Sequence, residues 1–188
     1  MTDDHLSGDL FAAPAVRLSG SMDETMLVSF REQLAAADER VSVVELFTLG
    51  GDPDVARTMG DDVARWREAA VGRRLVFLGK AAVYSAGVTF MSFFPRKDRY
   101  LAAGARLLIH ERQMQKTVRL EGPLSLCGIT AQRALHEIEA SQRIQSEDFA
   151  RLIQGSRVEM ADVVRRTPTD WYLDAAEAHA LGLVEAVV

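Results

Sequence analysis

Ser85 stands among small side chains, which suits a nucleophile. It follows an apolar strand predicted at 75–78, and Ala86 and Gly87 come directly after it, before the apolar segment 88–94. Small neighbours let a substrate backbone come close, and the amide after the serine can point at a developing oxyanion. A serine at a helix start is also a common N-cap, and taken alone Ser85 fits that structural role better.

Gly50 and Gly51 follow a second buried strand, predicted at 41–46. Paired glycines allow positive φ and leave their amides unshielded, so they could donate hydrogen bonds to a carbonyl or a phosphate. An ordinary turn would explain the pair as well. Neither the dinucleotide-binding nor the Walker glycine spacing occurs, so the sequence does not predict a phosphate loop.

His110 ends an apolar strand predicted at 106–110, a place where a general base could stand. A partly buried structural histidine is equally common there, so the position alone leaves both interpretations open. Asp170, which follows a Thr-Pro-Thr segment, could orient such a base or cap the segment after it.

The remaining histidines and the single cysteine indicate less. His5 falls in an N-terminal arm, and His136 and His179 fall on helix faces that we interpret as solvated. Cys127 lies in a segment that we interpret as a turn and short extended piece, where an idle thiol is commoner than a catalytic one. No two histidines have a metal-ligand spacing with a third ligand, so we expect no metal and no cofactor.

These residues must be positioned by alternating strands and helices. The periodicity predicts strands at 16–20, 41–46, 75–78, 100–103, 106–110 and 184–188, helices at 23–34, 52–66, 88–94, 130–155 and 175–180, and a hairpin or arm over 113–128. The strand-helix alternation of the first half indicates parallel βαβ units with helices outside the sheet. We expect a flexible arm at residues 1–13 and one domain over residues 14–188.

Composition narrows the class of protein. The 188 residues are 48% hydrophobic and 26% charged, the balance of a soluble globular protein. A net charge of −5 without a dense Lys/Arg cluster argues against nucleic acid as a partner. No apolar run approaches the roughly 18 residues of a membrane span, and the N-terminus lacks the plan of a signal peptide. We therefore expect no membrane partner and a cytoplasmic location.

Taken in order, the motifs resemble those of the Clp protease proteolytic subunit. Gly50-Gly51 after a buried strand is followed by Gly-Lys-Ala-Ala-Val-Tyr-Ser-Ala-Gly around Ser85, and then by Leu-Leu-Ile-His ending at His110. The interval of 25 residues from Ser85 to His110 is similar to the one the family uses. Asp170 and the later Ala-Ala-Glu-Ala-His-Ala-Leu-Gly-Leu-Val resemble the family's closing motif. The resemblance covers about residues 15–188.

The resemblance implies a serine endopeptidase that works through an acyl-enzyme. Ser85 would attack a peptide carbonyl, His110 would take its proton and return it to the leaving amine, and Asp170 would fix the imidazole tautomer. The amides of Gly51 and Ala86 would form the oxyanion hole.

The resemblance also implies a fold and partners. The fold is an α/β spiral of ββα units of the ClpP/crotonase type, with a helical and extended handle over residues 111–155 for oligomerisation. The implied partners are peptide or unfolded-protein substrates, further copies of the chain in a homo-oligomeric ring, and an AAA+ unfoldase.

Some positions depart from the family pattern. The family's Asn-Ser-Pro before the glycine pair is Phe-Thr-Leu at 47–49, its methionine after the nucleophile is Ala86, and its ring-contacting arginine is Thr169. The segment between His110 and the long helix is expanded. These departures favour, as an alternative, a catalytically silent ring subunit. A crotonase-type acyl-CoA enzyme shares the spiral, but that class works with acidic residues and needs no Ser-His-Asp triad.

Overall fold

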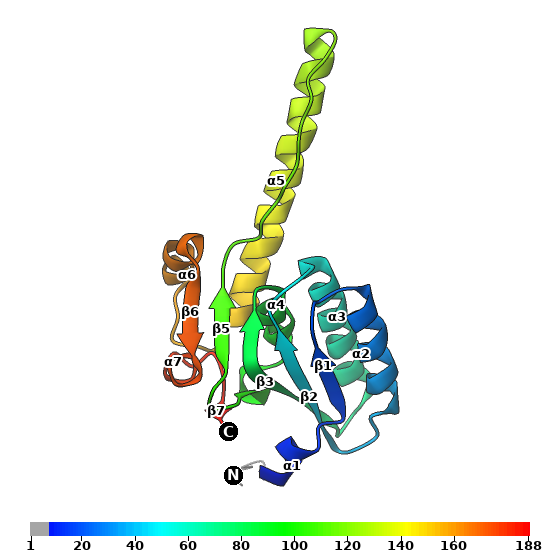
Figure 1. Cartoon of the computed structure of the whole chain (residues 1–188), viewed down its shortest axis with the longest axis vertical. Coiled ribbons are helices and arrows are strands. Elements are labelled where there is room, and N and C mark those ends of the chain that lie inside the picture. Colours follow the sequence, from blue (N-terminus) through cyan, green and yellow to red (C-terminus); the bar gives the residue numbers. More distant parts are fainter. Residues whose placement is uncertain (1–7) are drawn as a thin grey trace.

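The computed structural model describes residues 8–188, and in this part of the chain seven strands form one sheet. The strands are β1 (Val16–Ser19), β2 (Val41–Thr48), β3 (Arg74–Tyr84), β4 (Arg99–Leu101), β5 (Arg106–Ile109), β6 (Trp171–Asp174) and β7 (Ala186–Val187). Their order is β1-β2-β3-β4-β7, with β5 beside β3 and β6 beside β5 (Figure 1). All pairings are parallel except that of β5 with β6. The predicted parallel α/β architecture is confirmed.

Helices connect the strands. They are α1 (Gly8–Ala12), α2 (Glu24–Ala36), α3 (Pro53–Ala69), α4 (Ala86–Ser92), α5 (Leu124–Ile153), α6 (Met160–Arg166) and α7 (Ala175–Ala180), with 3-10 turns η1 (Arg96–Asp98) and η2 (Thr167–Thr169). Asp23 caps α2 by accepting from the Met26 amide at 3.0 Å, and Asp52 caps α3 by accepting from the Asp54 amide at 2.7 Å.

The two central strands are buried on both faces, as their unbroken apolar runs predict. Val44 and Leu46 of β2 face the main core beneath α2, α3 and α4, while Val43 faces a second cluster with Phe11 and Tyr100. Phe11 packs on Tyr100 with ring centroids 5.0 Å apart. Residues 8–12, which we expected to belong to a frayed arm, form α1 because this contact holds them. Residues 1–7, including His5, lie outside the described residues.

Strand β3 is longer than the predicted 75–78 and pairs with two neighbours along one edge. Its first part pairs with β4, and its last part, residues 82–84, pairs with β5. Ala81, with a φ of 52°, lies between the two parts. Residues 80–84 have small and mixed side chains, so the hydrophobic pattern did not predict that the strand continues through them. This extension places the ends of β3 and β5 side by side.

Helix α5 begins at Leu124, six residues before the predicted start at residue 130. Gly128 disguises its first turns, since glycine costs about 1 kcal/mol relative to alanine within a helix. Residues 111–122 form no regular element and run beside α5, which projects from the sheet (Figure 1). Despite its length, neither α5 nor any other helix of residues 8–188 is long and apolar enough to cross a membrane. The short elements β6 and α6 were not predicted.

Arg99 on β4 is the largest of the buried polar side chains in residues 8–188. Its side chain is 2% exposed and donates five hydrogen bonds, all to backbone carbonyls. The acceptors belong to Ser92, Phe94, Arg151, Leu152 and Leu183, at 2.7–3.3 Å. Arg99 therefore joins the C-terminal ends of α4 and α5 to the loop before β7.

Replacing Arg99 with methionine should lower the free energy of unfolding by about 3–5 kcal/mol, because buried carbonyls lose their donors. Chemical denaturation followed by circular dichroism, at one fixed protein concentration, measures this change. The exposed Arg165→Met is the control and should cost less than about 0.5 kcal/mol. If Arg99→Met lowers the free energy of unfolding by less than about 1 kcal/mol, water must be supplying the hydrogen bonds that the five carbonyls received from the guanidinium.

Candidate active site

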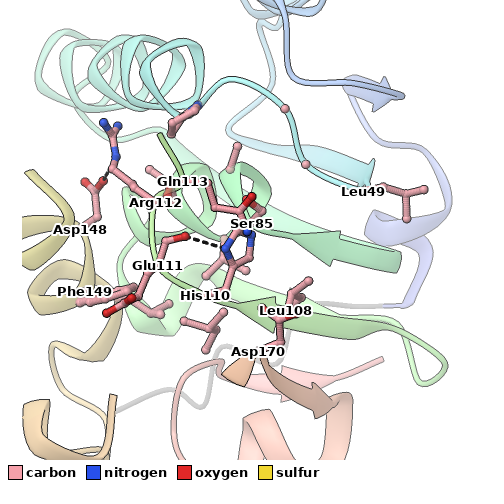
Figure 2. Close-up of a pocket in the computed structure, with 18 residues that line it drawn as sticks. Leu49, Ser85, Leu108, His110, Glu111, Arg112, Gln113, Asp148, Phe149 and Asp170 are labelled. Atoms are coloured by element: carbon pink, nitrogen blue, oxygen red, sulfur yellow. Dashed lines mark hydrogen bonds and ion pairs between the residues drawn. The ribbon is translucent and has the colours of Figure 1, made fainter. Parts of the chain in front are cut away.

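The C-terminal ends of three parallel strands supply the candidate site. Gly50 and Gly51 follow β2, Ser85 follows β3, and His110 follows β5. Parallel strands end at the same edge of a sheet, where α/β proteins commonly bind ligands. These four residues and Asp170 line one cavity of about 430 Å³ (Figure 2). The structure thus brings all of the sequence-predicted site residues to one place, Ala86 included.

Ser85 has a backbone that is rare for a residue with a side chain. Its φ is 54° and its ψ is −114°, and its amide donates to the Leu108 carbonyl at 2.9 Å. Such a strained turn between strand and helix is how nucleophilic serines are presented in other folds. The Ser85 side chain makes no capping hydrogen bond to α4. The simpler interpretation of Ser85 as an N-cap therefore loses its physical basis.

The turn at Gly50 and Gly51 is fixed by Thr48 and Met22. The buried Thr48 hydroxyl accepts from the Gly50 amide and donates to the Gly50 carbonyl, both at 3.0 Å. A Cβ at Gly50 would come within 3.1 Å of Ser85 Cβ, and one at Gly51 would lie 2.5 Å from the Met22 carbonyl oxygen. Both glycines have positive φ, so only glycine fits this approach to the serine.

Two backbone amides near Ser85 lack an acceptor within residues 8–188. The Met22 and Asp52 amides form the hydrogen bonds of the adjacent bridge, which leaves the Gly51 amide unpaired. The Ala86 amide opens α4, where helical amides have no intrahelical acceptor. Unpaired amides on both sides of a serine can stabilise an oxyanion that forms on a carbonyl between them.

His110 donates from Nδ1 to the backbone carbonyl of Glu111 at 2.6 Å (Figure 2). A carbonyl only accepts, so Nδ1 carries the proton, and in the neutral form of the ring Nε2 is then free to accept. This is the tautomer that a general base needs toward a serine hydroxyl. Within the described residues, no hydrogen bond joins His110 to Ser85 or to Asp170.

Asp170 lies across the β5–β6 pairing from His110. Ile109 pairs with Trp171, so the next position of the antiparallel register sets His110 opposite Asp170. Asp170 has a φ of 56° and is exposed on the cavity wall. Asp174, four residues on, has another role, because it accepts from the Glu177 amide at 2.8 Å in a capping box. Asp174 therefore caps α7.

Charged residues that the sequence did not single out line the far wall of the cavity. Arg112, on the extended segment after His110, and Asp148, on α5, both face it. Asp148 accepts from Arg57 and from Arg151, the latter at 3.0 Å. Burial raises the pKa of the Asp148 carboxyl, and the neighbouring guanidinium groups oppose this shift only in part. Arg112 lies only two residues after His110, and this nearness in the sequence was the available signal.

The other reactive side chains lie apart from this cavity. His136 and His179 are exposed on helices, as expected. Cys127 lies in the first turns of α5 and not in a turn with an extended piece, so that interpretation is wrong. Within residues 8–188, no three His, Cys, Asp or Glu side chains gather in a way that could hold a metal ion.

Comparison with known proteins identifies the fold. No family model and no curated protein matches the chain. Among solved structures, a point mutant of ClpP1 from Listeria monocytogenes matches with a TM-score of 0.69. It is 15% identical in sequence, and the match covers 92% of this chain and 90% of that one. The ClpP-like fold expected from the motifs is therefore confirmed; at this identity the likeness shows the fold alone.

Proposed function

We propose that the chain is a serine-type peptidase of the Clp proteolytic-subunit kind. The observation that carries the proposal is Ser85, which has a strained backbone and a hydroxyl free of capping, with the unpaired Gly51 and Ala86 amides near it. The ClpP-like fold supports the same reaction class. In this proposal residues 14–188 form a single peptidase domain.

In the proposed reaction Ser85 Oγ attacks the carbonyl carbon of a peptide bond while His110 Nε2 accepts the hydroxyl proton. The amides of Gly51 and Ala86 donate to the oxyanion, each contributing roughly 3–4 kcal/mol to the transition state. His110 then gives the proton to the leaving amine, and water hydrolyses the acyl-enzyme by the same route. Asp170 accepts from Nδ1 once substrate is bound, since catalytic hydrogen bonds often tighten only in the complex.

We further propose a homo-oligomeric ring, with α5 and residues 111–122 at a subunit contact. In support, this projecting part exposes several large apolar side chains: Met114, Leu120, Leu124, Leu126 and Ile129. Contiguous exposed apolar surface on a soluble protein commonly marks an interaction site. An AAA+ unfoldase as a partner rests on the sequence resemblance.

A fluorophosphonate probe should label the protein at Ser85, and Ser85→Ala should abolish both labelling and hydrolysis of a fluorogenic peptide. Circular dichroism should show the variant folded. Unchanged hydrolysis by Ser85→Ala would overturn the assignment. Absence of labelling in the wild type would instead favour the silent ring subunit or the acyl-CoA enzyme.

Asp170→Asn should reduce kcat by up to roughly 10⁴-fold, because the amide favours the wrong imidazole tautomer. Steady-state peptide hydrolysis measures this, and Asp174→Asn is the matched control. Asparagine still caps a helix, so the control should stay within a few-fold of wild type. A nearly unchanged rate for Asp170→Asn would assign the orienting role to the Glu111 carbonyl.

Sedimentation velocity at micromolar concentration should show an oligomer of six or seven subunits per ring. Leu124→Glu combined with Leu126→Glu should yield smaller species, because charges enter the apolar contact. The control is Val71→Glu, which changes a side chain that is 91% exposed on the α3–β3 turn. A monomeric wild type would refute the ring.

A further inference from the structure

The peptide group between Glu111 and Arg112, in the wall of the cavity, has both of its polar atoms in use. The Glu111 carbonyl accepts from His110 Nδ1 at 2.6 Å, and the Arg112 amide donates to Gln145 Oε1 at 2.6 Å. This peptide group is trans, so its C=O and its N–H point in opposite directions. Gln145 on α5 therefore fixes, from one side, the plane whose carbonyl holds the imidazole on the other side.

The Glu111 carbonyl competes with Asp170 for the Nδ1 proton of His110. Asp170 lies across the β5–β6 pairing from His110, but no hydrogen bond joins the two within residues 8–188. Nδ1 carries one proton, so a bond to the Glu111 carbonyl excludes a full bond to Asp170. A carboxylate stabilises the imidazolium that forms during catalysis better than a neutral carbonyl does, since charge-assisted hydrogen bonds are roughly twice as strong. The weaker acceptor therefore holds the proton in this arrangement.

The chain is anchored on either side of this peptide group. Ile109 pairs with Trp171 on β6, and the Arg112 side chain donates from Nη2 to Asp54 on α3 at 2.7 Å. Rotation about the two backbone dihedrals that flank a peptide group turns its plane and leaves the neighbouring Cα atoms nearly in place. The Glu111–Arg112 plane can therefore turn without displacing β5, β6 or α3, and the turn breaks only the two hydrogen bonds of the plane.

We propose that Gln145 is a positioning residue that regulates the candidate base; this rests on the proposed peptidase function. By accepting from the peptide N–H, Gln145 holds the Glu111 carbonyl against Nδ1 and keeps His110 in a resting arrangement. When the plane turns, Nδ1 is released to Asp170, which gives the working arrangement of the triad. Because the Gln145 bond exists only in the resting arrangement, this one side chain shifts the populations of the two.

The first test measures how fast a fluorophosphonate probe labels Ser85. Gln145→Leu removes the acceptor at similar volume and should raise the labelling rate roughly three- to tenfold, the equivalent of one hydrogen bond between neutral groups. In an Asp170→Asn background the same change should alter the rate by less than about twofold, because the released Nδ1 has no carboxylate to reach. A purely structural role of Gln145 predicts instead that Gln145→Leu slows labelling in both backgrounds.

Two further variants of α5 separate the acceptor from the side chain that carries it. Gln145→Glu keeps an oxygen acceptor for the peptide N–H, so it should label no faster than the wild type. Gln142→Leu makes the matched change at an exposed position of the same helix and should leave the labelling rate unchanged. If Gln145→Glu labels as fast as Gln145→Leu, loss of the acceptor is not the cause and the proposal is wrong.

Hydrogen exchange of the Arg112 amide tests the same two arrangements without catalysis. Gln145→Leu should speed this exchange about threefold or more, because the amide loses its acceptor. Asp170→Asn weakens the acceptor that favours the turned plane, so it should slow the exchange, as reciprocal coupling requires. Unchanged exchange in Asp170→Asn, or slower labelling of Gln145→Leu than of a wild type that labels, would overturn the proposal. Failure of the peptidase function shows separately, as an absence of wild-type labelling, and the exchange rates still report on the peptide group.

Discussion

The arrangement of the site depends on the buried guanidinium of Arg99, which pairs with no carboxylate of residues 8–188. Arg99 satisfies its donors with five carbonyls, four of them at the C-terminal ends of α4 and α5. Helix C-termini carry partial negative charge, so they suit a guanidinium that burial would otherwise disfavour. Burial lowers the Arg99 pKa to about 10, and the side chain remains charged at neutral pH. Because α4 begins just after Ser85, these contacts at the far end of the helix help to hold the candidate nucleophile in position.

A second constraint acts at the N-terminal side of α4. The Thr48 hydroxyl closes the turn at Gly50, and Gly50 in turn packs against Ser85. Thr48 belongs to the Phe-Thr-Leu segment that departs from the family pattern, yet it supplies the polar group that this turn needs. In this chain the Phe-Thr-Leu segment therefore closes the turn through Thr48.

The sequence predicted what depends on local patterns and missed what depends on distant partners. Buried strands, the helix starts at Asp23 and Asp52, and the strand end at His110 all leave marks within a few residues. Arg99 does not, because arginine is mostly exposed and three of its five acceptors, in Arg151, Leu152 and Leu183, lie more than 50 residues along the chain. The predicted start of α5 was too late because a glycine such as Gly128 usually indicates a turn, whereas here it lies within the helix.

The sequence likewise predicted which motifs lie at the site. It did not predict how the side chains of these motifs contact one another. The register of β5 and β6 sets His110 opposite Asp170. Which group accepts the Nδ1 proton, however, is decided by the peptide between His110 and Arg112, which no periodicity describes.

That peptide is anchored at both ends. Ile109 is paired with Trp171 on one side, and the Arg112 amide is bound to Gln145 on the other. Only two residues lie between these anchors, and they carry the imidazole and the carbonyl that now accepts from it. A rotation of the Glu111 peptide alone would free the Nδ1 proton for Asp170, with β5, β6 and α5 in place.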